Sequence, residues 1–322
     1  MISPLKHPEI AGRLRACSLD DQDVFVLLAA DHRQNVLKQF DASLNTEQAA
    51  ALLSTLKVDF AQHLAGSTTG YLTDPIYGFE PCLASPNVPA TLPLIVALEN
   101  TGYVGEGWER MPSLVEDFNA SEALRMGATA TKLLVYYHPE AANAAEKEDF
   151  IRTVAGECQA AGLPLFLEPL VHSPHPDGTL HKGTPAYEDA VVGTAERLSR
   201  TGAAIMKMEF PGGDTDNRQR WEAACARLDA ACATPWVLLG AGVTFEVFLE
   251  QTAVACSAGA SGVLVGRTIW GETIHLDPEE RAQALRSVGV DRLNQLRHVI
   301  AEKGHAWSER GGQASSSPDV ER

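Results

Sequence analysis

The feature that most restricts the fold of this chain is a short apolar run that recurs eight times, each time followed by a stretch with helical punctuation. The runs cover residues 24–33, 68–75, 92–100, 128–137, 163–171, 203–211, 235–242 and 261–270. Eight strand–helix units in succession predict a single (β/α)8 TIM barrel of the α/β class. A doubly wound open sheet is the alternative. It requires a glycine-rich turn after the first strand, and AADHRQN at 29–35 is not such a turn.

Helix boundaries between the runs are marked by capping residues and glycines. Thr46, Ser121, Thr184 and Thr244 stand at helix starts, and the pair Asp277-Pro278 opens another segment. We expect residues 1–307 to form one barrel domain, with the first 20 residues as a helical segment beneath it. Residues 308–322, SERGGQASSSPDVER, are polar and rich in serine and glycine, which predicts a disordered tail.

Composition and charge exclude several classes of partner. The formal net charge of -16 argues against binding nucleic acid or an anionic membrane. No run approaches the ~18 apolar residues that span a bilayer, and the first ten residues lack the apolar core of a signal peptide. The 6 cysteines show no CxxC spacing, which predicts reduced, buried thiols in a cytoplasmic protein. For the oligomeric state we expect a homo-oligomer, and the dimer is the commonest form of such assemblies.

Charged residues interrupt three of the apolar runs, namely Lys132 in the fourth, Glu168 in the fifth and Lys207 in the sixth. A charge in such a run is costly unless it faces a polar cavity or a partner. Side chains alternate across a strand, so Lys207 shares a face with Glu209, opposite the apolar Met206 and its neighbours. These charges should therefore point into the barrel near its carboxyl end, where active sites of this fold lie.

The first three runs end in Asp31, Asp74 and Glu99, and we expect these carboxylates to converge on the same mouth. An ion-pair layer that merely plugs the barrel is the structural alternative. Burying so many charges without a use is expensive, which favours a catalytic mouth.

Two lysines beside a carboxylate suit imine chemistry. Lys132 and Lys207 should stand about two strand spacings apart, with Glu168 between them. A second ammonium and partial burial both lower a lysine pKa, and the free amine can attack a ketone. Glu168 is the first choice for accepting the hydroxyl proton, while Glu209 or Asp31 could shuttle protons. Alternation alone leaves the choice of nucleophile between the two lysines open.

The last two strands suggest an anion site. LLGAGVTFE holds Gly240 and Gly242 before a helix start, and VGRTIW offers Gly266 and Arg267. Glycine backbones, free N–H groups and one arginine make a phosphate cradle, which barrels of this fold commonly place after strands seven and eight. The pattern predicts a phosphorylated small-molecule substrate.

Two rival functions are compatible with parts of the sequence. His172, His175 and His181 in VHSPHPDGTLH could ligate zinc, but no carboxylate motif accompanies them, so we expect no metal and no cofactor. A non-catalytic sugar-phosphate sensor would keep the pocket without needing two lysines beside a glutamate.

The same residues lie in motifs that resemble those of class I tagatose-1,6-bisphosphate aldolases over nearly the whole chain. The motifs are, in order, AADHRQNVLKQF, LTDPIYG, LIVALENTGY, ATKLLVYY, PLFLEPL, MKMEFP, LLGAGV and GVLVGRTIW. The resemblance implies a carbon–carbon lyase with a (β/α)8 barrel and no metal. It implies cleavage of a ketose 1-phosphate or 1,6-bisphosphate, first of all tagatose 1,6-bisphosphate, to dihydroxyacetone phosphate and glyceraldehyde 3-phosphate.

Carried over by motif, the resemblance places the Schiff-base lysine on Lys207, a second active-site lysine on Lys132 and the acid/base glutamate on Glu168. Asp31 and Arg33 match an Asp-Gln-Arg motif, in which Asp31 joins the catalytic group. The substrate- and phosphate-binding residues that we expect are Arg33, Glu99, Glu209, Gly240, Gly242, Gly266 and Arg267.

The sequence departs from the family pattern in three places. His32 replaces the glutamine of Asp-Gln-Arg, Gly240 replaces a serine, and the segment 211–239 is shorter than usual. The shorter segment is similar in length to that of 6-deoxy-6-sulfofructose-1-phosphate aldolases. Cleavage of that sulfonated ketose to dihydroxyacetone phosphate and sulfolactaldehyde is therefore the alternative activity.

Overall fold

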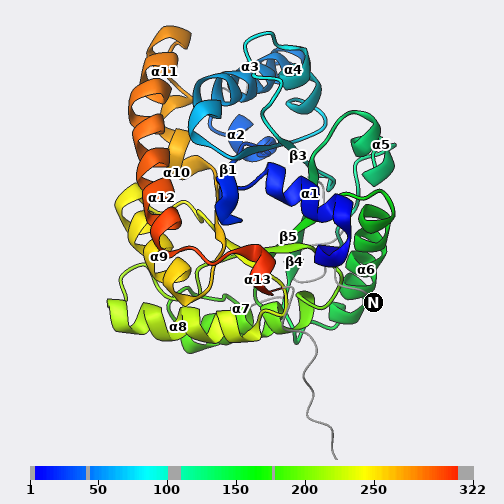
Figure 1. Ribbon diagram of the computed structural model, residues 1–322, viewed down its shortest axis with the longest axis vertical. Helices are drawn as coiled ribbons and strands as arrows, with labels where there is room; N and C mark the ends of the chain where they lie inside the picture. Colours follow the sequence, from blue (N-terminus) through cyan, green and yellow to red (C-terminus); the bar gives the residue numbers. More distant parts are fainter. Residues whose placement is uncertain (1–3, 41–43, 101–109, 176–177, 311–322) are drawn as a thin grey trace, which may run out of the picture.

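The eight apolar runs form the strands of a closed parallel barrel in which each strand pairs with the next along the chain and β8 returns to β1 (Figure 1). This computed structural model describes residues 4–40, 44–100, 110–175 and 178–310. The strands are β1 (Phe25–Ala29), β2 (Gly70–Thr73), β3 (Leu94–Ala97), β4 (Ala130–Tyr137), β5 (Leu165–Val171), β6 (Ile205–Met208), β7 (Trp236–Leu239) and β8 (Gly262–Val265). The closed order confirms the predicted TIM barrel and excludes the open doubly wound sheet.

The helices surround the barrel and also occupy one of its ends. They are α1 (Pro8–Ala16), α2 (Gln34–Leu37), α3 (Thr46–Leu64), α4 (Phe79–Ala84), α5 (Ala120–Arg125), α6 (Ala144–Ala160), α7 (Pro185–Leu198), α8 (Arg218–Ala231), α9 (Phe245–Ala258), α10 (Arg267–Trp270), α11 (Pro278–Ala284), α12 (Val290–Lys303) and α13 (Trp307–Arg310). Short 3-10 turns are η1 (Pro4–Lys6), η2 (Asp20–Gln22), η3 (Ala65–Ser67) and η5 (Gly271–Thr273), and a π-helical turn, η6 (Leu285–Gly289), joins α11 to α12.

Capping side chains set most helix starts where the sequence predicts them. The hydroxyl of Thr184 accepts from the N–H of Tyr187 at the start of α7, and Thr244 does the same at the start of α9. Two helix starts differ from the prediction, because Asn45 rather than Thr46 is the N-cap of α3, and Asn119 rather than Ser121 is the N-cap of α5. The side-chain oxygen of Asn45 accepts from the backbone N–H of Gln48, and the side-chain oxygen of Gln48 accepts from the backbone N–H of Asn45. This capping box satisfies both backbone donors.

Strand alternation divides the apolar side chains into two cores. One core fills the barrel interior and includes Phe25, Leu27, Phe166 and Ile205. The other lies between the strands and the surrounding helices; β6 contributes Met206 and Met208 to it. Met206 and Met208 therefore face the helices, as alternation predicts. Ile205 faces the barrel interior, on the same side of β6 as Lys207.

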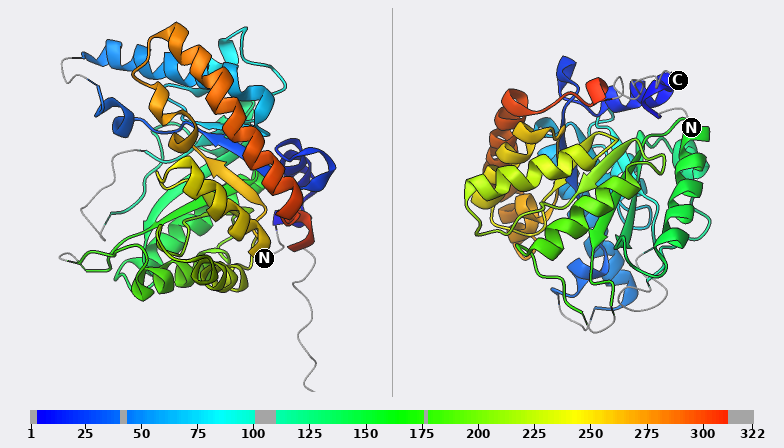
Figure 2. Two further views of the ribbon diagram at one scale, coloured as in Figure 1. Left: turned by 90° about the vertical axis from the view of Figure 1, so that its left-hand side faces the viewer. Right: turned by 90° about the horizontal axis from the view of Figure 1, so that it is seen from below.

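The amino end of the barrel is closed by segments from both parts of the sequence. Ile10 and Leu14 of α1 pack into the interior core together with Trp307 of α13. The indole Nε1 of Trp307 donates to Ser18 Oγ at 2.9 Å, and its backbone N–H donates to Asp23 O at 2.9 Å. Helices α1 and α13 lie side by side at this end in both views (Figure 2), as expected for the N-terminal helical segment.

The ordered C-terminal region extends slightly further than the sequence predicts. We expect the tail to begin at residue 308, but α13 continues to Arg310. The guanidinium of Arg310 donates to Cys232 O at 3.1 Å and pairs with Asp229, which fixes this last turn to α8 and the residue after it. Residues 311–322, the rest of the predicted tail, lie outside the described residues.

The cysteines and the helices agree with the expectations from composition. All six cysteines are buried and unpaired. Within the described ranges, no helix has the length and apolar content required to cross a bilayer.

Candidate active site

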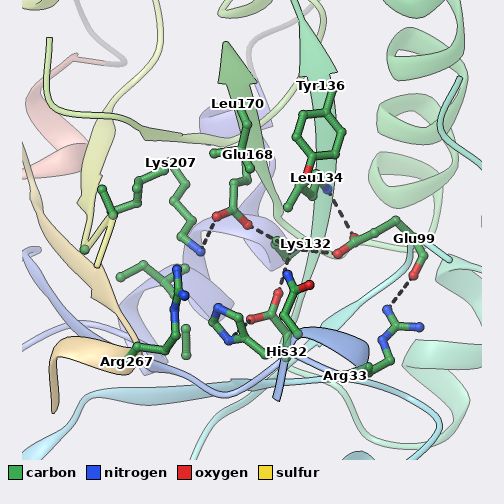
Figure 3. Close-up of a pocket in the computed structure, with 18 of the residues that line it drawn as sticks. His32, Arg33, Glu99, Lys132, Leu134, Tyr136, Glu168, Leu170, Lys207 and Arg267 are labelled. Atoms are coloured by element: carbon green, nitrogen blue, oxygen red, sulfur yellow. Dashed lines mark hydrogen bonds and ion pairs between the residues drawn. The ribbon is translucent and has the colours of Figure 1, made fainter. Parts of the chain in front are cut away.

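A cavity of about 710 Å³ opens at the carboxyl ends of the strands, opposite α1 and α13. It is lined by ten of the eleven predicted site residues, which come from β1, β3 to β8 or the segments that follow them (Figure 3). These are Asp31, Arg33, Glu99, Lys132, Glu168, Lys207, Glu209, Gly240, Gly266 and Arg267. Gly242 is the exception.

Alternation along β4 and β5 brings the central charges into the cavity. Lys132 shares its face with Leu134 and Tyr136, and Glu168 shares its face with Leu170; all five line the cavity. The opposite faces of both strands pack into the outer apolar core. A one-residue shift of register would have turned these charges into the helical layer.

Lys132 is surrounded by three carboxylates. Its Nζ lies 2.7 Å from Asp31 Oδ2, 2.7 Å from Glu99 Oε1 and 2.8 Å from Glu168 Oε2. Burial alone would lower the pKa of Lys132, but the negative charges of Asp31, Glu168 and Glu99 outweigh it and hold that pKa well above its ordinary value. Lys132 is therefore a fixed ammonium.

Lys207 has a simpler environment. Its Nζ lies 2.7 Å from Glu168 Oε1, the single ion pair of this lysine within the described residues. Glu168 thus bridges the two lysines with one oxygen each. Burial would raise the pKa of Glu168, yet Lys132 and Lys207 together hold it below its ordinary value, so the bridging group is a carboxylate.

Glu99 and Arg33 form the opposite wall. Burial raises the pKa of Glu99 despite the nearby Lys132. Its Oε2 accepts from the N–H of Leu134 at 3.1 Å, and its backbone oxygen accepts from Arg33 Nη2 at 2.6 Å. Arg33 is 3% exposed, and its Nε and Nη1 are buried without a hydrogen-bond partner among the described residues. The guanidinium therefore keeps donors for an anionic or hydroxylated ligand.

Glu209 lies two residues beyond Lys207, on the same face. Its Oε2 accepts from the N–H of Val171 at 2.7 Å. Burial raises the pKa of Glu209 from 4.5 to about 7, although the Val171 bond opposes the change. The native protein therefore binds a proton at Glu209 between pH 4.5 and 7, where the unfolded chain has already released it.

A stability measurement tests this assignment. Because the native state holds the extra proton, the Glu209 contribution to the free energy of unfolding falls as pH rises from about 5 to 8. The shift corresponds to at most about 3 kcal/mol. Relative to wild type, Glu209→Gln should be near neutral at pH 5 and stabilising at pH 8, as measured by urea unfolding. The same substitution at the exposed Glu250 of α9 is the control. A Glu209→Gln effect that is equal at both pH values would contradict the assignment.

The glycines after β7 and β8 shape the wall around Arg267. A Cβ on Gly266 would come within 2.8 Å of Ala29 O, so only glycine fits there. Gly242 has a φ of 79°, and a Cβ built on it would lie 3.6 Å from Arg267 Nη2. Gly242 thus stands behind the guanidinium instead of in the cavity wall, while Arg267 is exposed to the cavity.

Several polar cavity residues were not assigned a role from the sequence, among them His32, Lys38, Arg110 and Lys182. His32 lines the cavity beside Asp31, with 3.8 Å between Nδ1 and Asp31 Oδ1, and its ring packs edge-on against Trp270 at 5.6 Å. Burial lowers the pKa of His32 to about 4, and Arg267 and Lys207 add to the effect against the opposing charge of Asp31. The imidazole is neutral at physiological pH. Its position in the sequence, between Asp31 and Arg33, is the signal that could have identified His32 as a cavity residue.

The prediction that Asp74 faces the mouth is wrong. Strand β2 ends at Thr73, and Asp74 turns away from the barrel axis to pair with Lys57 of α3 at 2.9 Å between Oδ2 and Nζ. Alternation applies only while the backbone is extended, and here a turn begins at Asp74, whose Oδ1 accepts from the N–H of Ile76 and of Tyr77.

The histidine loop after β5 shows no metal geometry in the part of the chain that the structure describes. His172 Nδ1 lies 2.6 Å from the neighbouring Ser173 O. No group of three His, Cys, Asp or Glu side chains among the described residues is placed to hold a metal ion. Residues 176–177 of this loop, and residues 101–103 of the motif LIVALENTGY, lie outside the described residues.

Solved structures share this fold at low sequence identity. The chain matches a Schiff-base-forming fructose-1,6-bisphosphate aldolase with a TM-score of 0.55 at 18% identity, covering 86% of this chain and 97% of that one. It also matches an archaeal fructose-1,6-bisphosphate aldolase, whose catalytic lysine carries a carbinolamine intermediate. There the TM-score is 0.57 at 17% identity, with 90% and 98% of the two chains covered.

Curated relatives are similar along almost their whole length. They include tagatose 1,6-diphosphate aldolases of Streptococcus pneumoniae (28% identical, 92% of this chain and 98% of the relative) and Streptococcus mutans (29%, 90% and 94%). A third, from Staphylococcus aureus, is 28% identical, with 90% and 95% covered. The profile of the DeoC/LacD family aldolases matches residues 25–272, which span every strand of the barrel and the whole cavity wall. With the barrel, the cavity and this match in agreement, the chain belongs to the DeoC/LacD family of aldolases.

Proposed function

We propose that this enzyme cleaves tagatose 1,6-bisphosphate to dihydroxyacetone phosphate and glyceraldehyde 3-phosphate through an imine on Lys207. The observation that carries the proposal is the unequal pairing of two lysines on one carboxylate. Lys132 contacts three carboxylates and is held as an ammonium, whereas Lys207 lines the cavity and forms an ion pair, among the described residues, with Glu168 alone. We therefore assign Lys207 as the amine that attacks the carbonyl.

Glu168 can accept the proton that leaves the substrate in the cleavage step. The neutral Lys207 amine attacks the C2 carbonyl, and the carbinolamine takes up a proton on its hydroxyl group and loses water to give an iminium. Glu168 accepts the C4 hydroxyl proton as the C3–C4 bond breaks, and the electron pair of that bond moves toward the iminium to give an enamine. The aldehyde leaves, C3 is protonated, and hydrolysis releases dihydroxyacetone phosphate and Lys207. Lys132 keeps Glu168 ionised and ready to accept the proton.

Two arginines in the cavity can hold the charged ends of the substrate. Arg267 follows β8 and lines the same cavity as Lys207, a position that suits the 1-phosphate of a ketose whose C2 meets Lys207. Arg33 lines the same cavity, and two of its buried donors, Nε and Nη1, have no hydrogen-bond partner in the part of the chain that the structure describes. The names of the curated relatives support a ketose bisphosphate as the first substrate to test.

Borohydride trapping tests the proposal. Incubation with tagatose 1,6-bisphosphate and sodium borohydride should inactivate the enzyme irreversibly, with the reduced adduct on the Lys207 peptide by mass spectrometry, and EDTA should leave turnover unchanged. Parallel assays use fructose 1,6-bisphosphate and 6-deoxy-6-sulfofructose 1-phosphate. Faster cleavage of the sulfonated ketose would replace the substrate assignment, and tight binding without product from any ketose would favour a sensor.

Arg267→Ala should raise the KM for phosphorylated ketoses at least ~tenfold, a loss of about 1.4 kcal/mol of binding free energy. The reason is the loss of a charge-assisted contact between the Arg267 guanidinium and a phosphate group. Steady-state kinetics on the preferred ketose provide the measurement, with the exposed Arg286 of η6 changed to alanine as the control. An unchanged KM would remove Arg267 from the phosphate site.

A further inference from the structure

A second buried ion pair lies just outside the cavity, between α3 and the ends of β1 and β2. Lys57 Nζ is 2.9 Å from Asp74 Oδ2, and the two side chains are 3% and 0% exposed. Neither residue lines the cavity. A buried ion pair is a weak source of stability because both charges lose their hydration. The reason for burying Lys57 and Asp74 is therefore to be found in the backbone groups that they hold in place.

The ammonium of Lys57 holds the backbone on both sides of Asp31. It donates to Ala30 O and, at 2.8 Å, to His32 O. The ion pair with Asp74 is the third polar contact of this ammonium. Asp31 is the residue between the two bonded carbonyls, so Lys57 fixes the peptide groups that set the direction of its side chain.

Asp74 and Gly78 are placed to keep Lys57 in this position. Asp74 Oδ1 accepts from the N–H of Ile76 at 3.0 Å and of Tyr77 at 2.9 Å, which anchors the carboxylate in a turn. Gly78 follows that turn, and a Cβ there would come within 2.8 Å of Lys57 Cδ. The loop after β2 thus provides both a fixed counter-charge for Lys57 and the space for its stem.

The loop after β1 connects this pair to the reacting groups. Asp31 Oδ2 lies 2.7 Å from Lys132 Nζ, and Lys132 lies 2.8 Å from Glu168, which in turn contacts Lys207 (Figure 3). A shift of Asp31 would release one of the three carboxylates that hold Lys132 beside Glu168. Misplacement of a catalytic group by about 1 Å can cost ~100-fold in rate.

We propose that Lys57 is a positioning residue that acts through Asp31, with Asp74 as its buried counter-ion. The role rests on the proposed function, because it concerns the carboxylate that holds Lys132 in the imine-forming cluster. Lys57 itself touches no reacting atom. Substitution of Lys57 should therefore no longer affect catalysis when Asp31 has lost its charge and cannot form an ion pair with Lys132.

A double-mutant cycle tests this dependence. The paired variant Lys57→Met/Asp74→Asn removes both charges, and the asparagine keeps an oxygen for the Ile76 and Tyr77 N–H groups. We expect it to lower kcat ~10- to 100-fold with KM within threefold. In an Asp31→Asn background, the same pair should lower the residual kcat less than threefold. Equal losses in both backgrounds, or no loss in the first, would overturn the proposal.

A matched control lies two residues away on the same helix. Asp59 of α3 pairs with Arg281 of α11 at 2.7 Å, with side chains that are 21% and 6% exposed, and this pair does not contact the β1 loop. Arg281→Met/Asp59→Asn should lower the melting temperature and leave kcat unchanged. A loss of kcat in this control equal to that of the Lys57 pair would show that destabilisation of α3 alone accounts for the effect.

Folding and function are separated by two further measurements. Thermal unfolding by circular dichroism verifies each variant, and if the paired variant is unfolded at 25 °C, Asp74→Asn alone is carried through the same cycle with a ~3- to 10-fold expected loss of kcat. Equal losses in both backgrounds would again overturn the role. Failure of the wild type to cleave any ketose phosphate counts against the proposed function. Normal cleavage by the paired variant counts against Lys57 alone.

Discussion

Lys207→Ala is expected to abolish cleavage, with a loss in kcat of roughly four orders of magnitude or more, as for removal of other covalent nucleophiles. Among the described residues, Lys207 forms an ion pair with a single carboxylate, that of Glu168. Lys132 cannot replace Lys207 as the nucleophile, because three carboxylates hold Lys132 as an ammonium. Single-turnover and steady-state assays on the preferred ketose phosphate measure the loss.

The variant should remain folded. Lys207 borders the cavity, and after its removal Glu168 keeps Lys132 as a partner at 2.8 Å. A melting temperature within a few degrees of wild type is the control. Borohydride should then trap no adduct. Near-normal turnover, or a reduced adduct on Lys132 in this variant, would show that the nucleophile was assigned to the wrong lysine.

Glu168→Gln is expected to lower kcat by roughly two to four orders of magnitude, the usual contribution of a general base. The amide keeps one oxygen that can accept from a lysine, but it cannot accept the hydroxyl proton. Imine formation should persist, so borohydride should still label Lys207 while product appears slowly. This combination distinguishes loss of proton transfer from loss of binding.

The control for Glu168→Gln is the same change at Glu148 of α6. Glu148 is 7% exposed, accepts from the hydroxyl of Tyr137 at 2.7 Å and pairs with Arg152 and Arg197, all outside the cavity. That variant should lose stability and keep its kcat. If Glu168→Gln retains kcat within fivefold of wild type, Asp31 or Glu209 is the base.

Alternation along extended backbone made most of the candidate site predictable from the sequence. Lys132, Glu168 and Lys207 each interrupt an apolar run, and closure of the barrel brings neighbouring strands side by side, so their convergence follows from local pattern and topology. The sequence did not predict that Lys132 contacts three carboxylates whereas Lys207 contacts one. This difference depends on where Asp31 and Glu99 point after their strands have ended.

Residues beyond the strand ends marked the limit of prediction. Asp74 has the alternation of an inward residue, but the turn that it caps directs its carboxylate to Lys57. Lys57 lies within an amphipathic helix, where a lysine ordinarily faces solvent, and no local pattern indicates that it reaches the carbonyls of Ala30 and His32. Contacts between a helix and a loop that are distant in sequence require the fold itself.

The floor made by α1 and Trp307 has a consequence for biosynthesis. Translation delivers α1 first, yet the surfaces that it covers are complete only when β8 has been made, and the indole that locks it to Ser18 follows some forty residues after that strand. Until then the growing polypeptide exposes apolar surface at this end, the condition under which nascent chains associate wrongly or recruit chaperones. Closure of this end of the barrel thus waits for Trp307, which is synthesised after all eight strands.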